Sequence, residues 1–319
     1  MKKLVEKYEM SYIRRMGNYK THETENELIV LLPVGCYWAK KTGGCAYCGY
    51  RALVDEMVST TEPMRYVEIL RHELNKQTET IDRLSFFVGG SFFEIPREER
   101  LELFRELKKY PSIHEVYIET RPQLITPDNI DELKKCLEGK KLSVAIGLET
   151  YSDEIRNNIH KKGITNEDFI KGMKILNEAG VSSLIYVFVK PPVENITDKE
   201  AIDEALQTIK FCFENHAEAI ELECGYIVEN SDMHELYNQG KYDVLSLWSI
   251  RDLILEALSI SNEGIIRLAH FTDTPKPIAI PSNCEKCSDK FYKMLDRYRE
   301  TLDSKYLEEV IECDCRKES

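Results

Sequence analysis

The residues best suited to chemistry are three cysteines near the start of the chain, Cys36, Cys45 and Cys48. They lie in a glycine-containing loop that directly follows an apolar stretch, residues 28–34, predicted to be a strand. Three thiolates separated by eight and then two residues can ligate three corners of a [4Fe-4S] cluster and leave one iron open to a ligand. A zinc ion is the alternative, but it requires a fourth ligand, and no candidate has the usual short spacing.

A second group of cysteines lies near the end of the chain, as two pairs separated by a predicted helix: Cys284, Cys287, Cys313 and Cys315. Four thiolates arranged in this way indicate a structural zinc site, although the second pair has one intervening residue where two to four are usual. A further iron-sulfur cluster is the alternative, and His270 is a possible substitute ligand. The remaining cysteines are predicted to be buried and inert: Cys136, Cys212 and Cys224.

Length and composition limit the class of protein. The chain has 319 residues, of which 42% are hydrophobic and 31% charged, as expected for a globular protein and not for a disordered or fibrous one. No apolar run is long enough for a membrane span, and the first residues lack the apolar stretch of a signal peptide, so a cytoplasmic location is expected. The net charge of −13 argues against non-specific binding of nucleic acid by overall charge.

Short β-branched or aromatic runs alternate with segments of helical periodicity, which is typical of repeated βα units around a parallel sheet. Strands are predicted at residues 28–34, 84–88, 115–119, 142–147, 183–189 and 219–223, with a possible seventh at 264–269. Helices are predicted at residues 63–76, 97–109, 128–136, 166–179, 199–215 and 245–261. The pattern predicts an α/β fold, a partial (β/α)6 TIM-like barrel with its active site at the C-terminal ends of the strands.

The polar, proline-bearing stretch 272–283 is the predicted domain boundary. The barrel and an N-terminal arm would then occupy residues 1–271, and a small cysteine-rich metal-binding module would occupy residues 272–319.

The cysteine loop after the first predicted strand resembles that of the radical S-adenosylmethionine (SAM) superfamily, in its variants with a lengthened first gap. Tyr47, directly before the third cysteine, matches the aromatic residue usual there. In that superfamily the open iron binds the amino and carboxylate groups of SAM, and an electron from the cluster cleaves SAM to a 5′-deoxyadenosyl radical. The resemblance therefore implies a [4Fe-4S] cluster and SAM as cofactors.

Further matches follow at the ends of the predicted strands. Gly89, Gly90 and Ser91 resemble the Gly-Gly element whose backbone binds the SAM amino group. Glu119 and Arg121, in Glu-Thr-Arg-Pro, resemble an element of the Elongator catalytic subunit and its relatives, which implies contacts to polar groups of SAM. A surface ion pair is the alternative for these two residues.

Two charged residues at later strand ends are the predicted catalytic residues. Glu149 ends the fourth predicted strand and could hydrogen-bond the ribose of SAM or the substrate, and Lys190 follows the fifth strand at the expected mouth of the barrel. Lys161 and Lys162 offer cations near the same rim, although solvated charge ahead of a helix is an equal alternative.

Together these elements most resemble the family of radical SAM enzymes that complete archaeosine, a modified guanine of archaeal transfer RNA. The resemblance also includes Lys190-Pro191-Pro192, the helix start Leu247-Trp248-Ser249 and the late cysteine pairs. It implies cleavage of a carbon–nitrogen bond in a lysine-bearing 7-deazaguanine. The implied partners are transfer RNA, the archaeosine synthase subunit that attaches lysine, and an electron donor such as ferredoxin or flavodoxin.

The uneven distribution of charge indicates which part of the chain could contact transfer RNA. Residues 1–60 carry nine Lys and Arg against seven Asp and Glu, whereas residues 196–230 carry two against nine. Transfer RNA contacts are therefore expected from the N-terminal arm and from the cluster loop, at Lys2, Lys3, Lys7, Arg14, Arg15, Lys20, Lys40 and Lys41.

Two other functions remain open from the sequence. One is a radical SAM enzyme that acts on a small molecule, a peptide or another transfer RNA position, which the acidic balance favours. The other is a non-catalytic iron-sulfur or zinc RNA-binding protein, which would have no need of Gly89-Gly90 or of Glu119 and Arg121 at strand ends.

Overall fold

One sheet of eight strands, in the order β1 to β8, forms the centre of the computed structural model. The structure describes residues 9–48, 56, 65–229, 231–260, 264–272 and 276–318. The strands span Ser11–Gly17 (β1), Thr24–Leu31 (β2), Arg83–Phe87 (β3), Glu115–Glu119 (β4), Lys141–Glu149 (β5), Ser182–Val189 (β6), Ala219–Cys224 (β7) and Ile265–Leu268 (β8). Strands β2 to β8 are parallel to their neighbours, and β1 is antiparallel to β2.

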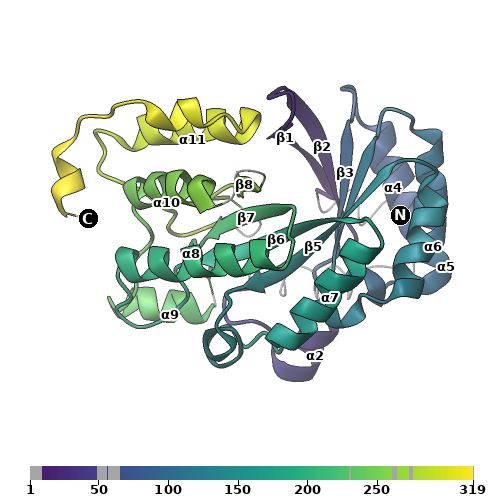
Figure 1. Cartoon of the computed structure of the whole chain (residues 1–319), viewed down its shortest axis with the longest axis horizontal. Coiled ribbons are helices and arrows are strands. Elements are labelled where there is room, and N and C mark those ends of the chain that lie inside the picture. The colour runs from purple at the N-terminus through teal and green to yellow at the C-terminus, as the bar shows by residue number, and fades with distance from the viewer. Residues whose placement is uncertain are drawn as a thin grey trace.

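Helices follow the strands and cover the outside of the curled sheet (Figure 1). They span Tyr37–Thr42 (α2), Tyr66–Asn75 (α4), Arg97–Glu106 (α5), Pro127–Leu137 (α6), Asn166–Glu178 (α7), Asp198–Glu214 (α8), Asp232–Asn238 (α9), Leu247–Ile260 (α10) and Ser288–Thr301 (α11). The predicted partial barrel is confirmed, including the seventh parallel strand. Strand β1 and helices α2 and α9 were not predicted.

Local sequence signals account for the helix starts. Thr165 and Thr197 form capping boxes with Asp168 and Glu200, so free backbone N–H groups of the first turns of α7 and α8 are satisfied by side chains. The Thr126 hydroxyl accepts a hydrogen bond from the backbone N–H of Asn129 at the start of α6, and Pro127 follows at the first helical position.

The inner face of the sheet is layered because alternate residues of each strand point inward. An apolar layer comes from β4 to β8 and consists of Tyr117, Ala145, Leu184, Ala219 and Ile265. A polar layer closer to the C-terminal ends of the strands includes Glu119, Tyr186 and Glu221. The layering leaves the C-terminal ends of the parallel strands free to line a cavity.

Helix α11 contacts the two edge strands of the sheet, β1 and β8, and also β2 (Figure 1). Tyr298 donates to the carbonyl oxygen of Ile266 at 2.6 Å, and the Arg299 guanidinium donates to the carbonyl oxygens of Leu268 and Ala269. The predicted division at residue 272 stays a prediction, with the added observation that α11 packs into the barrel's core cluster. None of the helices in the described ranges is long and apolar enough to cross a membrane.

Candidate functional site

A cavity of about 620 Å³ lies at the C-terminal ends of the strands and brings most of the predicted site residues together. Its lining includes the predicted residues Cys36, Cys45, Tyr47, Cys48, Gly89, Gly90, Glu119, Arg121 and Glu149. Ligand and cofactor pockets in proteins commonly measure roughly 300–1,000 Å³. The cavity therefore has the size and the position expected of the active site of an α/β barrel.

The cysteine loop forms one wall of this cavity. Cys36 caps α2, because its Sγ accepts a hydrogen bond from the backbone N–H of Ala39 at 3.4 Å. Burial raises the pKa of Cys45, and the positive charges of Lys162 and Arg121 act in the opposite direction. These cations would stabilise the thiolate that metal ligation requires.

The end of β3 lies directly against this loop at Gly90. A Cβ atom at position 90 would lie 2.5 Å from the carbonyl oxygen of Gly35 and 2.9 Å from the Cα of Cys36. Only glycine allows this approach of two backbones, and it brings the main chain at residues 89–90 to the cavity. Ser91 is fully buried, and its Oγ accepts from the backbone N–H of Arg121 at 3.1 Å, so it joins β3 to β4 and does not line the cavity.

Glu149, Tyr47 and Lys162 form a compact polar group at the end of β5. The Tyr47 hydroxyl donates to Glu149 Oε1 at 2.8 Å and accepts from Lys162 Nζ at 2.9 Å, and Lys162 also forms an ion pair with Glu149. Burial lowers the pKa of Lys162, but Glu149 and Cys45 outweigh it and hold that pKa above its ordinary value. Glu149 has a φ of +70°, a left-handed conformation that is costly for a non-glycine residue and that accumulates at functional sites.

Arg121 is held in place by the segment that carries Lys162. Its guanidinium donates to the carbonyl oxygens of Lys162 and Gly163 at 2.8 and 2.7 Å and lies 4.7 Å from the ring centre of Trp38. The Trp38 indole donates to the carbonyl oxygen of Lys161 at 2.8 Å. A Cβ atom at position 163 would lie 2.1 Å from the Trp38 ring, so glycine there is required for the stacking.

Glu119 lies deeper, in the polar layer of the barrel. Its Oε1 accepts from the Tyr186 hydroxyl at 2.9 Å. Burial raises the pKa of Glu119 to about 7; repulsion from Glu221 adds to the increase, whereas the Tyr186 hydrogen bond opposes it. A carboxyl group with such a pKa holds and releases a proton near neutral pH.

The position of Arg14 contradicts the expectation that this residue of the N-terminal arm contacts transfer RNA. Its guanidinium points into the barrel and pairs with Glu27 at 3.0 Å and Glu221 at 2.8 Å, so it is not available to transfer RNA. Arg15, Lys20, Lys40 and Lys41 are exposed, as expected, whereas Lys2, Lys3 and Lys7 lie outside the described residues.

Lys190 is not among the residues that line the cavity. Its ammonium group is buried in an ion pair with Asp198 at 2.7 Å, near the start of α8, and the Tyr242 hydroxyl donates to its carbonyl oxygen at 2.7 Å. Its φ of +68° turns the chain at the end of β6. Lys190 therefore stabilises the chain that follows β6 and does not lie with the other predicted site residues in the cavity.

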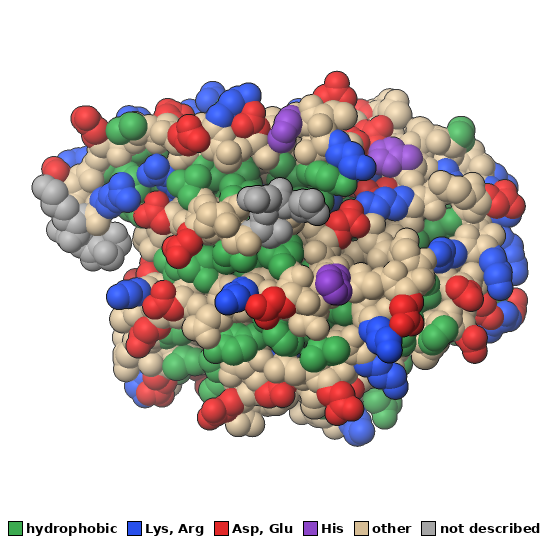
Figure 2. Space-filling model, viewed as in Figure 1, with side chains coloured by type: hydrophobic (Ala, Val, Ile, Leu, Met, Phe, Trp, Pro, Cys, Tyr) green, Lys and Arg blue, Asp and Glu red, His purple; other side chains and the backbone are tan. Residues whose placement is uncertain are grey.

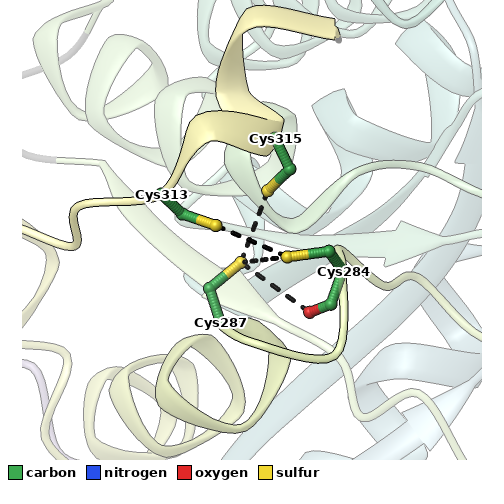
Figure 3. A group of neighbouring side chains, drawn as sticks. All are labelled: Cys284, Cys287, Cys313 and Cys315. Carbon is green, nitrogen blue, oxygen red and sulfur yellow. Dashed lines mark hydrogen bonds between the residues drawn. The ribbon is translucent and has the colours of Figure 1, made fainter.

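The four late cysteines converge on one point (Figure 3). The sulfur–sulfur distances are 3.7 Å for Cys284 and Cys287, 3.4 Å for Cys284 and Cys313, and 3.5 Å for Cys287 and Cys315. A tetrahedral zinc ion with bonds of about 2.3 Å to sulfur holds its ligands roughly 3.8 Å apart. The Trp248 indole donates to Cys315 Sγ and lowers its pKa to about 6. This cysteine group can hold a metal ion, and its spacing fits zinc.

The two cysteine groups differ in how closely their sulfur atoms lie. Within the described residues, the late cysteines are the one set of three or more possible ligands whose atoms all lie within 4.8 Å of one another. Cys36, Cys45 and Cys48 do not form such a set, although all three line the cavity.

The chain matches the Radical SAM superfamily over residues 34–206, more than half of its length, and belongs to that superfamily. It is therefore an enzyme whose cofactors are a [4Fe-4S] cluster and SAM. The match includes the cysteine loop and the ends of β3, β4, β5 and β6 described above.

Two relatives carry a functional name. The archaeosine synthase subunit beta of Methanosarcina acetivorans is 26% identical over 303 residues, which cover 92% of this chain and 84% of that protein. The archaeosine synthase subunit beta of Thermococcus kodakarensis is 26% identical over 297 residues, covering 91% and 89%. An uncharacterised protein of Methanocaldococcus jannaschii is 29% identical, with coverage of 90% and 79%.

Solved structures support the fold. The archaeal Elp3 of Methanocaldococcus infernus, with an N-terminal deletion, has a TM-score of 0.50 and 16% identity over 72% of this chain and 57% of that one. The queuine lyase of Clostridium spiroforme, bound to SAM and queuine, has a TM-score of 0.50 and 19% identity over 81% of this chain and 95% of that one. At these identities the likeness concerns the fold alone.

Several cavity residues were not predicted from the sequence. Trp38 acts through contacts with a segment over a hundred residues away, which no local pattern reveals. Lys162 was expected only as a cation near the rim, with solvated charge as the equal alternative, and the structure places it in the cavity beside Tyr47. Tyr186, Glu221 and Glu223 carry a usable signal, since they are polar residues at alternate positions of strands that are otherwise apolar. Cys224 and His270 also line the cavity, although Cys224 was expected to be inert and His270 to be a possible ligand of the late cysteine group.

Proposed function

We propose that this enzyme completes archaeosine in transfer RNA, by breaking the carbon–nitrogen bond that joins a lysyl side chain to a modified 7-deazaguanine. The observation that carries the proposal is the similarity to two proteins named archaeosine synthase subunit beta, which extends over nine-tenths of the chain. The arrangement of the cavity supports it, because the cysteine loop and the strand-end residues of the radical SAM type line a single space.

Cys36, Cys45 and Cys48 would hold the cluster, and the surrounding polar groups would hold SAM. When bound together, these cofactors supply a 5′-deoxyadenosyl radical for hydrogen abstraction. The backbone at Gly89 and Gly90 can approach the SAM amino group closely, because no side chain intervenes. Arg121 and Lys162 provide positive charge suited to its carboxylate, and Glu149 provides an acceptor for ribose hydroxyls.

The protein's own contribution is to orient the reacting groups and to keep water away from them. The rings of Tyr47, Phe188 and His160 pack together beside the cavity, with Tyr47 4.7 Å from Phe188 and 5.0 Å from His160. This packing fixes the Tyr47 hydroxyl that binds Glu149 and Lys162. The polar groups are thus positioned before any ligand binds.

Transfer RNA would approach at the rim formed by α2. Tyr37 is 61% exposed, and Lys41 lies 5.9 Å from its ring centre, which combines a surface for base stacking with positive charge for phosphate. Elsewhere, acidic and basic side chains are interspersed over the face shown in Figure 2. We therefore propose that the partner subunit implied by the names of the relatives supplies further transfer RNA contacts, and that a ferredoxin or flavodoxin supplies the electron.

The test is an anaerobic reaction of the reconstituted enzyme with SAM, a reductant and transfer RNA that carries the lysyl adduct, followed by nucleoside analysis. The proposal predicts conversion of the adduct to archaeosine. The alternative is a radical SAM enzyme with another substrate. It would be favoured if no archaeosine formed and if a small molecule or a peptide, but not transfer RNA, stimulated SAM cleavage.

A further inference from the structure

Two sequence motifs that have no role in the proposed function meet at the carboxylate of Asp198, the first residue of α8. Lys190 begins the motif that follows β6, and its Nζ lies 2.7 Å from Asp198 Oδ1. Ser249 ends the motif at the start of α10, and its hydroxyl donates to Asp198 Oδ2 at 2.8 Å, as does the backbone N–H of Ser246 at 3.0 Å. Asp198 therefore joins the end of β6 to the first turn of α10.

The end of β6 that Asp198 holds belongs to the wall of the active-site cavity. Phe188 lies two residues before Lys190, lines the cavity and packs against the Tyr47 ring, with 4.7 Å between the ring centres. Tyr242 packs in the same apolar cluster as Phe188, and its hydroxyl donates to the carbonyl oxygen of Lys190 at 2.7 Å. A shift of Lys190 would therefore displace Phe188 and, with it, the ring of Tyr47 in the polar group at the end of β5.

The first turn of α10 also contacts the late cysteine group. The Trp248 indole donates to Cys315 Sγ at 3.4 Å. The backbone N–H of Leu247 donates to the side-chain oxygen of Asn283 at 2.9 Å, and Asn283 directly precedes Cys284. Helix α10 packs against both α8 and α11 (Figure 1). One helical turn thus connects the late cysteine group to Asp198.

The conformation of Lys190 depends on these contacts. Its side chain is 5% exposed, and a buried ammonium group requires a carboxylate partner. Its φ of +68° is costly for a non-glycine residue and persists only where the surrounding structure imposes it. The ion pair with Asp198 and the hydrogen bond from Tyr242 hold the residue in this conformation.

We propose that Asp198 is a positioning residue for the cofactor site: it holds Phe188 and Tyr47 in place and couples their position to the late cysteine group. The inference rests on the proposed binding of SAM beside Tyr47 and not on the identity of the substrate. Two coupled sites share a free energy, so a change at one alters binding at the other. The late cysteines would then influence the binding of SAM without contacting it.

The first experiment compares Asp198→Asn with Glu115→Gln. Glu115 is the matched control because its carboxylate, like that of Asp198, binds a lysine and a serine: Lys141 at 3.1 Å and Ser143 at 2.6 Å. Glu115 is the first residue of β4 and does not line the active-site cavity. Equilibrium binding of SAM to the anaerobically reconstituted proteins, without transfer RNA, is measured well below the Tm of each protein.

Both variants should lose stability, because each leaves a cation without its full partner. Asp198→Asn should also weaken SAM binding by about tenfold, whereas Glu115→Gln should bind SAM as the wild type does. Ser249→Ala, which removes one hydrogen bond to Asp198 and keeps the ion pair, should weaken SAM binding by roughly threefold. It replaces Asp198→Asn if that variant does not fold. Unchanged SAM affinity in the folded variant, or an equal loss in Glu115→Gln, would overturn the proposal.

The second experiment measures the coupling with a double-mutant cycle. Cys284→Ala should weaken SAM binding in the wild-type background, although Cys284 does not line the cavity. In the Asp198→Asn background it should have little further effect, because the connection is already broken. If the double variant does not fold, Trp248→Phe replaces Cys284→Ala, because it removes the donor to Cys315 and keeps an aromatic ring. Losses that simply add would show that the two sites act independently and would overturn the coupling.

The outcomes separate this inference from the proposed function. Wild-type protein that binds SAM but forms no archaeosine from the lysyl adduct would reject the proposed function and leave the role of Asp198 intact. Archaeosine formation, combined with SAM binding that does not respond to Asp198→Asn, would reject the positioning role alone.

Discussion

The Tyr47 hydroxyl donates a hydrogen bond to Glu149 Oε1 at 2.8 Å, which ties the residue before the third loop cysteine to the end of β5. Lys162 contacts both residues, so three separate segments meet at one point of the cavity. The position of the cysteine loop and the position of the polar groups are therefore fixed together. Tyr47 therefore contributes its hydroxyl group, which binds Glu149 and Lys162, as well as its aromatic ring.

Tyr47→Phe removes both hydrogen bonds of the hydroxyl and keeps the ring packed against Phe188 and His160. We expect the variant to retain its cluster iron and to bind SAM roughly tenfold more weakly, the usual scale for loss of a hydrogen bond to a charged group. Equilibrium binding of SAM to the reconstituted protein measures the change. Unaltered SAM affinity would show that this group does not hold the cofactor.

Gly163→Ala tests whether Trp38 positions Arg121. The added Cβ would collide with the Trp38 ring, and we expect a clear rise in the KM for SAM as the guanidinium loses its stacking partner. Gly180→Ala is the matched control, because Gly180 has a similar φ of +61° and nothing within 4 Å of the added atom. The control should lose only about 1 kcal/mol of stability, with no change in KM. If both variants altered the KM alike, backbone strain and not stacking would be the cause.

Cys284→Ala, or removal of the metal by a chelator, should destabilise the fold without removing the barrel cluster. Metal-binding energy at a structural site is folding energy, and loss of the site should lower the Tm by on the order of 10 °C. Cys136→Ala, on helix α6 outside both cysteine groups, serves as the control. Metal analysis of the purified proteins should show loss of zinc with cluster iron unchanged. Loss of cluster iron instead would show that the two sites were assigned wrongly.

Glu119 should make stability depend on pH. Its pKa is about 7 in the folded protein against an ordinary value of 4.5, so between these pH values the native state keeps a proton that the unfolded chain has released. The contribution of this group to stability therefore falls as the pH rises through that window and is constant above it. Glu119→Gln keeps an acceptor for Tyr186 but cannot ionise.

The free energy of unfolding of Glu119→Gln, relative to wild type, should accordingly increase from pH 5 to pH 8. Urea denaturation of both proteins at several pH values measures this difference. A difference that does not change with pH would show that Glu119 has an ordinary pKa in the folded protein.

The parallel strands and the larger helices could be predicted because their signals are local. Apolar runs mark the strands, and caps such as Thr165 mark helix starts. Strand β1 escaped prediction because two adjacent arginines interrupt its apolar pattern. Arg14 is stabilised inside the barrel by ion pairs with Glu27 on β2 and Glu221 on β7. Such long-range charge pairing has no local sequence signal.

The residues of the candidate site also fall into those with a local sequence signal and those without one. Residues attached to motifs, such as Glu119 and Arg121, could be identified because each stands at the end of a predicted strand. Trp38 could not, because its role depends on the glycine at position 163 and on the stacking of Arg121. Lys190 stands at a comparable strand end, yet its ammonium group is held in a buried ion pair with Asp198 and does not line the cavity.

The most direct test of the account is production of 5′-deoxyadenosine by the anaerobically reconstituted enzyme, with SAM, a reductant and transfer RNA that bears the lysyl adduct. Wild-type protein should release 5′-deoxyadenosine together with archaeosine, and Cys36→Ala, Cys45→Ala and Cys48→Ala should each lose both products and the cluster iron. Wild-type protein that carries only zinc at these cysteines, or that carries the cluster but cannot bind or cleave SAM, would contradict the account.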